Sequence, residues 1–169
     1  MARRAGTATI ELLDGDLVAI AQCIAIDADA FPYASAHFGL MGRSRSRSGR
    51  VWIARDPSDE RQRVVGFLAS RLRGRRGLAH PHLMHIEGLA VDQPARQQGI
   101  GRALVREAVA DARARRVHAV VLHVSVTNEA AIALYESEGF GISRKLPGFY
   151  PAGAFDGVTE ALEMAKLLR

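Results

Sequence analysis

The stretch Arg96-Gln97-Gln98-Gly99-Ile100-Gly101 decides how this chain is interpreted. It stands between an apolar run, 86–91, and an amphipathic run, 100–115, which predicts a strand, a glycine turn and a helix. Backbone N–H groups at a helix start lack partners within the helix, and the helix dipole adds partial positive charge, so such a turn suits phosphate. The two glycines let a ligand approach the backbone closely. Short glycine motifs also occur where nothing binds, so both interpretations stay open on this motif alone.

A second stretch, residues 122–140, favours the interpretation as a binding site. It contains the pattern Asn-x-x-Ala-x-x-Leu-Tyr-x-x-x-Gly-Phe between Asn128 and Phe140. Together, the turn and this pattern resemble the motifs of the GNAT superfamily of acetyl-CoA-dependent N-acetyltransferases. Within that superfamily the chain is most similar to the RimI-type and eukaryotic-type protein N-terminal acetyltransferases. The resemblance extends from about Thr7 to the C-terminus and is most specific over residues 84–140.

Length and composition predict one globular domain, residues 1–169. The chain is 48% hydrophobic and 24% charged, which is ordinary for a globular protein. No apolar run reaches the length of a membrane span, so we expect no membrane association and a cytoplasmic location. Cys23 is the only cysteine, which excludes an internal disulfide. It lies on the apolar side of a helical pattern, and we expect it to be buried.

Basic residues dominate the charge, which is +5 and carried mostly by arginine. A positive balance suits a protein that holds the phosphates of CoA, and it equally suits one that binds nucleic acid. Residues 42–50, Gly-Arg-Ser-Arg-Ser-Arg-Ser-Gly-Arg, have no apolar side chain and predict a solvated basic loop within the domain. One hypothesis is that this loop gates the site or attracts an acidic acceptor.

Periodicity predicts alternating strands and helices. The expected strands are 8–13, 51–55, 64–72, 84–91, 117–126, 142–146 and 158–167, with a hairpin around 56–59. The expected helices are 17–31, 35–41, 100–115 and 128–138; in the first, positions 17, 20, 24 and 26 are apolar, and Asp16 is a candidate N-cap. This order indicates a mixed α/β sheet. The resemblance implies the GNAT fold, a mixed central sheet flanked by helices with a splayed gap between the parallel strands 84–91 and 117–126 that admits CoA.

The resemblance also implies which residues hold acetyl-CoA, the cosubstrate. It assigns the pantetheine arm to the strand end and the pyrophosphate to the turn. A helix N-cap explains Asn128 without any ligand, although the family uses this residue to hold the cofactor arm as well. The residues implied in cofactor binding are Leu89, Ala90, Val91, Arg96, Gln97, Gln98, Gly99, Ile100, Gly101, Arg102, Asn128, Ala131 and Tyr135.

Transfer of an acetyl group to an amine needs a base for the amine, a stabilised oxyanion and an acid for the leaving thiolate. Tyr135 matches the family tyrosine that lies beside the CoA sulfur and acts as the acid; the alternative is aromatic packing. His123 is the candidate base, and the alternative is a structural histidine. RimI-type enzymes carry Glu at this position, whereas eukaryotic N-terminal acetyltransferases carry Leu-His-Val, as this chain does. Histidine, with a pKa of ~6.5, suits an N-terminal amine of pKa ~7.7–8 better than a lysine of pKa ~10.4.

Two more candidates share one face of the strand 84–91. His85 and Glu87 are two residues apart, so their side chains point to the same side. We expect one of them to help relay the amine proton through water. The run His80-Pro81-His82-x-x-His85 suggests a metal cluster, but strand alternation sends His80 and His82 to the face opposite His85. We therefore expect no metal.

The acceptor side is predicted from aromatic residues. Residues 148–157 resemble the Tyr-Tyr-x-x-x-Gly segment that closes over the substrate peptide in N-terminal acetyltransferases, with longer spacing and Phe149 in place of the first tyrosine. Tyr150 is the candidate for binding the acceptor backbone, and a strand-capping aromatic plug is the alternative. Phe31 and Tyr33 complete the candidate acceptor residues.

These motifs predict an acetyl-CoA-dependent N-acetyltransferase that works by direct attack in a ternary complex. The expected acceptor is a protein or peptide N-terminus, and the protein is expected to be a monomer or homodimer. Two alternatives stay open. One is a small-amine or lysine acetyltransferase of the same fold, because fold does not fix the acceptor. The other is a basic nucleic-acid-binding or regulatory module without catalysis, favoured by the Arg/Ser run and opposed by the retained Tyr135, Asn128 and glycines.

Overall fold

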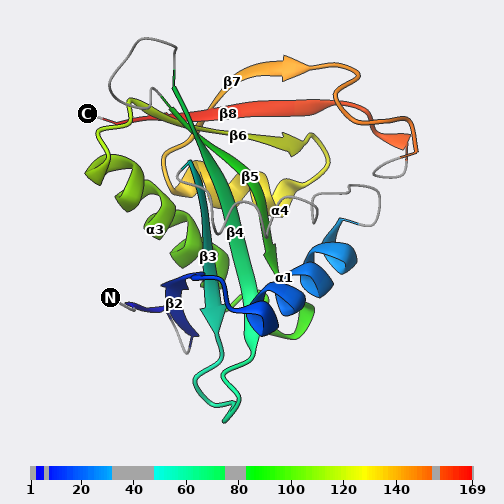
Figure 1. The fold of residues 1–169 in the computed structure, drawn as a ribbon. Helices are drawn as coiled ribbons and strands as arrows, with labels where there is room; N and C mark the ends of the chain where they lie inside the picture. The colour runs from blue at the N-terminus through cyan, green and yellow to red at the C-terminus, as the bar shows by residue number, and fades with distance from the viewer. Residues whose placement is uncertain (1–2, 6–7, 32–47, 75–82, 154–156, 169) are drawn as a thin grey trace.

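The computed structural model describes residues 3–5, 8–31, 48–74, 83–153 and 157–168. In these residues helices and strands follow one another along the chain, as the sequence predicts (Figure 1). The elements are β1 (Arg3–Ala5), β2 (Ala8–Leu12), α1 (Leu17–Ala30), β3 (Gly49–Arg55), β4 (Val64–Arg73), β5 (Leu83–Val91), the short 3-10 helix η2 (Gln93–Ala95), α3 (Ile100–Ala114), β6 (Ala119–Ser125), α4 (Glu129–Ser137), β7 (Gly141–Leu146) and β8 (Ala161–Leu167). None of the helices in these ranges is both long and apolar enough to cross a membrane.

The described strands form one sheet in the order β1-β2-β3-β4-β5-β6-β8-β7. Neighbouring strands are antiparallel except β5 and β6, which are parallel and are joined by the crossover through α3. A parallel pair needs such a crossover, whereas the antiparallel pairs can be joined by short turns. The predicted mixed sheet flanked by helices is confirmed.

The sheet separates two apolar cores. The helices lie on both sides of it (Figure 1). α1 lies on one face, where Ala19, Ile20 and Cys23 pack with Phe67 of β4. α3 and α4 lie on the other face, in a larger core that contains Leu104 together with Met84, Ile86, Leu122 and Tyr135. Side chains that alternate along β5 and β6 therefore reach opposite faces of the molecule.

β5 and β6 pair over a short distance only. Their parallel register runs from Leu83–Ala119 to Ile86–Leu122 and ends there, although both strands continue. The predicted gap between the two parallel strands is confirmed.

A bulge in β5 lies at the point where the gap opens. Glu87 is an extra residue between Ile86 and Gly88, which pair with adjacent residues of β4. Such a bulge bends its strand and increases the local twist. It also changes which face each residue occupies: Ile86 packs on the α3 side, whereas Ala90, four residues on, packs on the α1 side. Strict alternation, which the sequence analysis assumed, would have kept both residues on one face.

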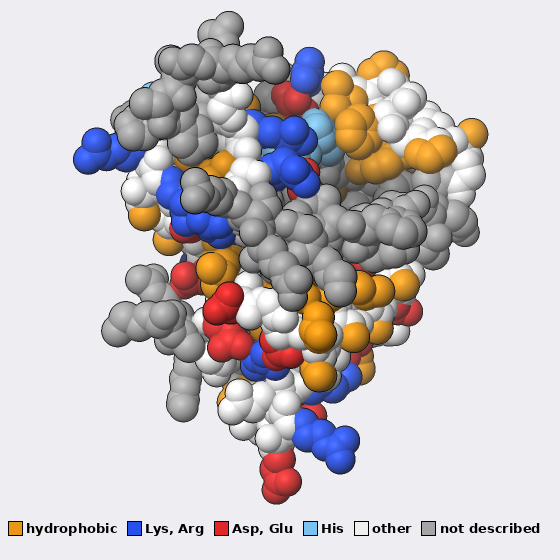
Figure 2. Space-filling model, in the orientation of Figure 1, with side chains coloured by type: hydrophobic (Ala, Val, Ile, Leu, Met, Phe, Trp, Pro, Cys, Tyr) orange, Lys and Arg blue, Asp and Glu red, His pale blue; other side chains and the backbone are white. Residues whose placement is uncertain are grey.

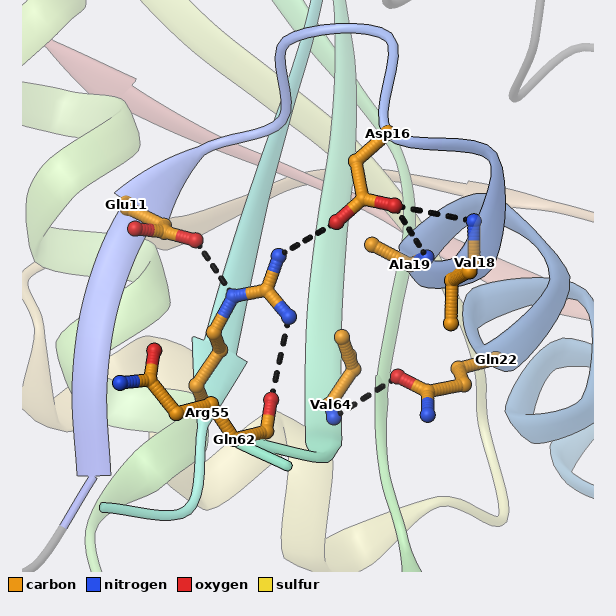
Figure 3. Close-up of polar contacts among 8 residues, drawn as sticks. All are labelled: Glu11, Asp16, Val18, Ala19, Gln22, Arg55, Gln62 and Val64. Carbon is orange, nitrogen blue, oxygen red and sulfur yellow. Dashed lines mark hydrogen bonds and ion pairs between the residues drawn. The ribbon is translucent and has the colours of Figure 1, made fainter. Parts of the chain in front are cut away.

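The start of α1 is fixed by charge and hydrogen bonds (Figure 3). Asp16 Oδ1 accepts from the backbone N–H groups of Val18 at 2.9 Å and Ala19 at 3.1 Å, which confirms the predicted N-cap. Asp16 Oδ2 pairs with Arg55 Nη2 at 3.0 Å, and Arg55 Nε pairs with Glu11 Oε1 at 2.5 Å. One arginine of β3 thus connects the β2 strand to the helix that follows it.

One apolar position of the expected first helix is not buried. Leu17 is 60% exposed, because the buried stripe of α1 consists of Ala19, Ile20, Cys23 and Asp27.

The structure also corrects several expected boundaries. β3 begins at Gly49, so the end of the run 42–50 is strand rather than loop; residues 42–47 and the expected helix 35–41 lie outside the described residues. The expected strands 117–126 and 158–167 begin later, at β6 and β8.

Cys23 is fully buried, as predicted, in the core beneath α1. Burial raises the pKa of its thiol to about 12, because the apolar surroundings disfavour the thiolate. Since the thiolate is the reactive form, this cysteine is inert in the folded protein.

We predict that Asp16→Ala lowers the thermal unfolding midpoint by several degrees, because it removes both the N-cap and the ion pair with Arg55. Asp16→Asn is the matched variant: its amide oxygen can still cap the helix, so its loss should be smaller. Circular dichroism melts at neutral pH measure both. Equal losses in the two variants would contradict the capping role.

Candidate functional site

A cavity of about 360 Å³ opens where β5 and β6 part. Its walls come from both parallel strands, from α4, from the end of α1 and from the segment after β7. The lining residues are Phe31, His85, Ile86, Glu87, Gly88, Leu89, Leu122, His123, Val124, Ser125, Asn128, Ala131, Tyr135, Phe149 and Tyr150. Nine of the predicted site residues are in this set: Phe31, His85, Glu87, Leu89, His123, Asn128, Ala131, Tyr135 and Tyr150.

The cavity reaches both sides of the sheet. Tyr135 and Ala131 belong to α4, which packs on the α3 side. His85 and His123 alternate with Ile86 and Leu122, residues of the α3-side core, so they point to the α1 side. Only because the strands separate can side chains from both faces line one cavity. The gap therefore brings a tyrosine on one side together with two histidines on the other.

The two histidines contact each other directly. His85 Nε2 lies 3.2 Å from His123 Nδ1, and their ring centroids are 4.9 Å apart. From the sequence alone these residues are separate candidates for the base. The structure brings them together: the parallel register pairs His85 with Val121, and His123, two residues further along β6, lies on the same face.

The surroundings of His85 favour the neutral form of its ring. Burial lowers the pKa of His85, and the neighbouring His123 lowers it further, while Glu87 acts in the opposite direction. Glu87 shares the face of His85, as predicted, and its carboxylate pairs with Arg71 Nε at 3.3 Å and Arg73 Nη2 at 3.7 Å. Glu87 therefore lines the cavity and forms ion pairs with two arginines of β4.

Glu163 of β8 contacts the second histidine, His123, and sequence reasoning missed it. It lies opposite His123 in the antiparallel register, with Oε2 at 3.4 Å from His123 Nε2. Arg144 Nη2 lies 2.7 Å from the same oxygen and Ser143 Oγ 2.8 Å from Oε1. The Arg144 guanidinium above all, then Ser143 and His123, hold the pKa of Glu163 at about 2, below its ordinary 4.5. The only signal in the sequence was a charged residue between the buried positions 162 and 164.

Tyr135 is buried and lines the cavity from α4. Its ring lies 5.8 Å from that of Phe140, so the aromatic packing named as the alternative interpretation is present. Burial raises the pKa of Tyr135 above its ordinary value of 10, so the hydroxyl keeps its proton at neutral pH. A role for this hydroxyl as an acid stays a prediction.

The glycine turn opens α3 as predicted. Gln97 and Gly99 both have positive φ, 62° and 79°, and Gly99 is the N-cap of the helix. This left-handed backbone leaves the first N–H groups of α3 at the helix start, where anions are favoured. Gly101 permits close packing: a Cβ there would lie 3.4 Å from Leu134 Cδ2, so α3 and α4 approach each other at this residue.

Side chains around the turn mainly bind the protein itself. Arg96 Nε donates to the carbonyl of Val91 at 3.0 Å, and Arg102 pairs with Glu138 at 3.1 Å. Gln98 Nε2 donates to a carbonyl in η2. Of the other predicted cofactor residues, Ile100 is buried and Ala90 lies in the α1-side core. What this turn offers a ligand is chiefly its backbone.

Asn128 caps α4, since its side-chain oxygen accepts from the N–H of Ala131 at 3.1 Å. The N-cap interpretation is confirmed, and the residue also lines the cavity. Both functions expected of it are therefore compatible in this position.

Two of the three acceptor candidates, Phe31 and Tyr150, line the cavity, and Phe149 lines it beside Tyr150. Phe149 lies against His123, with ring centroids 4.6 Å apart, and Tyr150 meets Phe149 edge-on at 4.9 Å. Burial raises the pKa of Tyr150. Phe31 lines the same cavity, whereas Tyr33 lies outside the described residues. On the face drawn in Figure 2, basic side chains and a histidine lie beside a group of hydrophobic ones.

No three His, Cys, Asp or Glu side chains in the described ranges are arranged to hold a metal ion. His80 and His82 lie outside those ranges.

The fold and the turn agree with a family match. Residues 7–140 match the model of the acetyltransferase (GNAT) family. This is more than half of the sequence, and the chain belongs to the GNAT family.

Curated relatives match over part of their length. The chain is 40% identical over 77 residues to the ribosomal protein bS18-alanine N-acetyltransferase of Escherichia coli, covering 46% of this chain and 51% of that protein. It is 32% identical over 122 residues to N-acetyltransferase family 8 member 3 of Rattus norvegicus, covering 71% and 47%. The chain thus spans about half the length of these relatives.

Solved structures match nearly the whole chain. NAA60 of Arabidopsis thaliana, in complex with a bisubstrate analogue, has a TM-score of 0.79 at 24% identity, with coverage of 94% of this chain and 98% of that one. The ribosomal-protein-S18-alanine N-acetyltransferase of Escherichia coli has a TM-score of 0.74 at 25% identity, with coverage of 95% and 93%. The GNAT fold expected from the sequence is confirmed.

The lowered pKa of Glu163 predicts a pH effect on stability. Because the folded-state pKa lies below the ordinary 4.5, this residue stabilises the fold above that pH, and the contribution is lost as pH falls toward about 2. Glu163→Gln should therefore lose less unfolding free energy than the wild type between those pH values. Urea unfolding at a series of acidic pH values measures this, and identical slopes would contradict it.

Proposed function

We propose that this protein is an acetyl-CoA-dependent N-acetyltransferase whose acceptor is the N-terminal α-amine of a protein or peptide. The observation that carries the proposal is the cavity between β5 and β6, which joins Tyr135 on one side to the His85–His123 pair on the other. An acid and a base on opposite sides of one opening suit the attack of an amine on a thioester and the departure of a thiolate.

The donor side fits acetyl-CoA, which supplies the activated acetyl group. The backbone N–H groups at the start of α3 suit the pyrophosphate, with Arg96 to Arg102 around it. The residues Leu89, Ala90 and Val91, where β5 has left β6, suit the pantetheine arm. Asn128 and Ala131 line the opposite wall.

The chemistry assigns a role to each side of the cavity. His85 and His123 take the proton that the acceptor nitrogen loses when it bonds to the acetyl carbon. Tyr135 gives its proton to the sulfur as the carbon–sulfur bond breaks. Because burial raises the pKa of Tyr135, its hydroxyl is protonated at neutral pH and has a proton to give when the thiolate leaves.

The choice of an α-amine rests on the base and on the acceptor residues. A neutral histidine matches an α-amine of pKa ~7.7–8, whereas a lysine of pKa ~10.4 is protonated far more completely at neutral pH. The aromatic group of Phe31, Phe149 and Tyr150 suits the first residues of a peptide. The name of one curated relative, ribosomal protein bS18-alanine N-acetyltransferase, agrees with a protein acceptor. The cytoplasmic location stays a prediction.

Thiol release tests the proposal directly. Acetyl-CoA is incubated with peptides of varied N-termini, with N-terminally blocked lysine peptides and with polyamines. Because Cys23 is buried and unreactive, a thiol reagent reports only the CoA that is released. We expect turnover only with free α-amines. Turnover only with small amines or lysine would show that the acceptor is not an α-amine. CoA binding without any turnover, together with a salt-dependent affinity for DNA, would favour the regulatory alternative.

We predict that Tyr135→Phe lowers kcat by roughly 10²-fold or more, in the range that general acids contribute, while the Kd of acetyl-CoA changes little. Tyr150→Phe is the matched variant at the acceptor side, and it should raise the acceptor KM with a smaller effect on kcat. Steady-state kinetics and calorimetric titration separate these effects. A full kcat in Tyr135→Phe would exclude the acid role.

We predict that Gly99→Ala weakens acetyl-CoA binding several-fold and lowers the unfolding free energy by about 1 kcal/mol, because φ of 79° is strained for a residue with a Cβ. Gly141→Ala is the control, since Gly141 lies in β7 without a positive φ and with open space around its Cβ position. Calorimetric titration measures the affinities. Unchanged affinity in Gly99→Ala would contradict the role of the turn.

A further inference from the structure

Four polar side chains form a row across four neighbouring strands. His85 of β5 contacts His123 of β6, with Nε2 and Nδ1 3.2 Å apart. His123 Nε2 lies 3.4 Å from Glu163 Oε2 of β8, and Arg144 of β7 holds the same oxygen at 2.7 Å. The register pairs Glu163 with His123 on one side and with Arg144 on the other, so the row follows from the sheet itself.

The contacts fix where the protons lie. The Glu163 carboxylate is ionised at neutral pH, so it can only accept. His123 therefore carries its hydrogen on Nε2, facing Glu163, and when neutral it presents a lone pair on Nδ1. His85 Nε2 must then donate to that lone pair. This leaves His85 Nδ1 as the nitrogen that can accept a proton.

We propose that Glu163 is a positioning residue that acts through His123. In this arrangement His85 receives the proton of the acceptor amine, and His123 ends with the positive charge that this proton brings. The inference rests on the proposed acetyl transfer. The amine proton passes, directly or through water, to His85 Nδ1, and the hydrogen on His85 Nε2 passes to His123 Nδ1. His85 ends neutral, and His123 becomes an imidazolium facing the Glu163 carboxylate.

The surroundings favour this direction of transfer. Burial lowers the pKa of His85, so His85 is a poor place for a lasting positive charge. The charged groups that act on His85 are Glu87 and, more weakly, Glu163, which favour its protonation, and Arg73, which opposes it. His123 instead faces an anion that Arg144 and Ser143 hold in place.

One further contact limits where the charge can go. The Phe149 ring covers His123, with centroids 4.6 Å apart, and Tyr150 packs on Phe149. The described polar contacts of the His123 ring are therefore His85 on one nitrogen and Glu163 on the other. Removing the Glu163 charge leaves the protonated ring beside Arg144 without a compensating anion.

The test uses two variants of the same ion pair that should act in opposite directions. In the full chain with ¹⁵N-labelled histidine at neutral pH, NMR follows the ¹H chemical shift of the His123 Nε2–H, which moves downfield as its hydrogen bond strengthens. Glu163→Gln keeps the shape of the side chain and removes its charge, so this signal should move upfield. Arg144→Gln removes the competing cation, so the signal should move downfield. No shift, or shifts in the same direction, would overturn the inference.

Kinetics supply the second readout. In Glu163→Gln, kcat should fall roughly tenfold or more, the KM for acetyl-CoA should change little, and the acid limb of the kcat profile should move to lower pH. A merely structural role would lower activity at every pH and move no limb. If the wild type is active but Glu163→Gln has the same acid limb of the kcat profile as the wild type, the inference is wrong while the proposed acetyl transfer stands. An inactive wild type would overturn the proposed acetyl transfer, and with it the relay, even if the NMR shifts are found.

Discussion

The site depends on one constraint, the end of hydrogen bonding between β5 and β6 at the pair Ile86–Leu122. The bulge at Glu87 marks this point and bends β5 away from its parallel neighbour. A continuous sheet would separate the α1 face from the α3 face completely. Here the opening admits side chains of α4 and of β5 and β6 into one cavity. The close-packed cores on the two faces of the sheet then keep these groups in fixed positions.

Charge is arranged around the gap according to the face of the sheet. At the start of α3, backbone N–H groups and a left-handed turn make a place for an anion, while arginine side chains nearby are largely engaged with the protein. Across the sheet, Glu163, Arg144 and the two histidines form a row in which every member has a polar neighbour. The tyrosine between these two regions is buried in apolar surroundings. Phosphate recognition and proton handling thus belong to different elements that meet only at the gap.

Sequence reasoning predicted most elements, because their signals are local. The N-cap at Asp16, the glycine turn before α3 and the cap at Asn128 each depend on a few adjacent residues. The contact between His85 and His123, and the place of Glu163, depend on strand register between residues about forty positions apart, which periodicity does not contain. The bulge at Glu87, after which the residues of β5 switch faces, cannot be predicted for the same reason, because a bulge is defined by the pairing with the neighbouring strand. Leu17 belongs to the apolar pattern of the expected helix but is exposed, because the buried stripe of α1 is set by Ala19, Ile20 and Cys23.

The central claim is that this cavity transfers an acetyl group to an N-terminal α-amine. The most direct measurement is tandem mass spectrometry of one peptide that carries both a free N-terminus and an internal lysine, after incubation with the protein and acetyl-CoA. Both amines then compete under identical conditions within one molecule. The account predicts a single acetyl group on the first residue. An acetyl group on the lysine, or none on the peptide while the protein still binds acetyl-CoA, would contradict it.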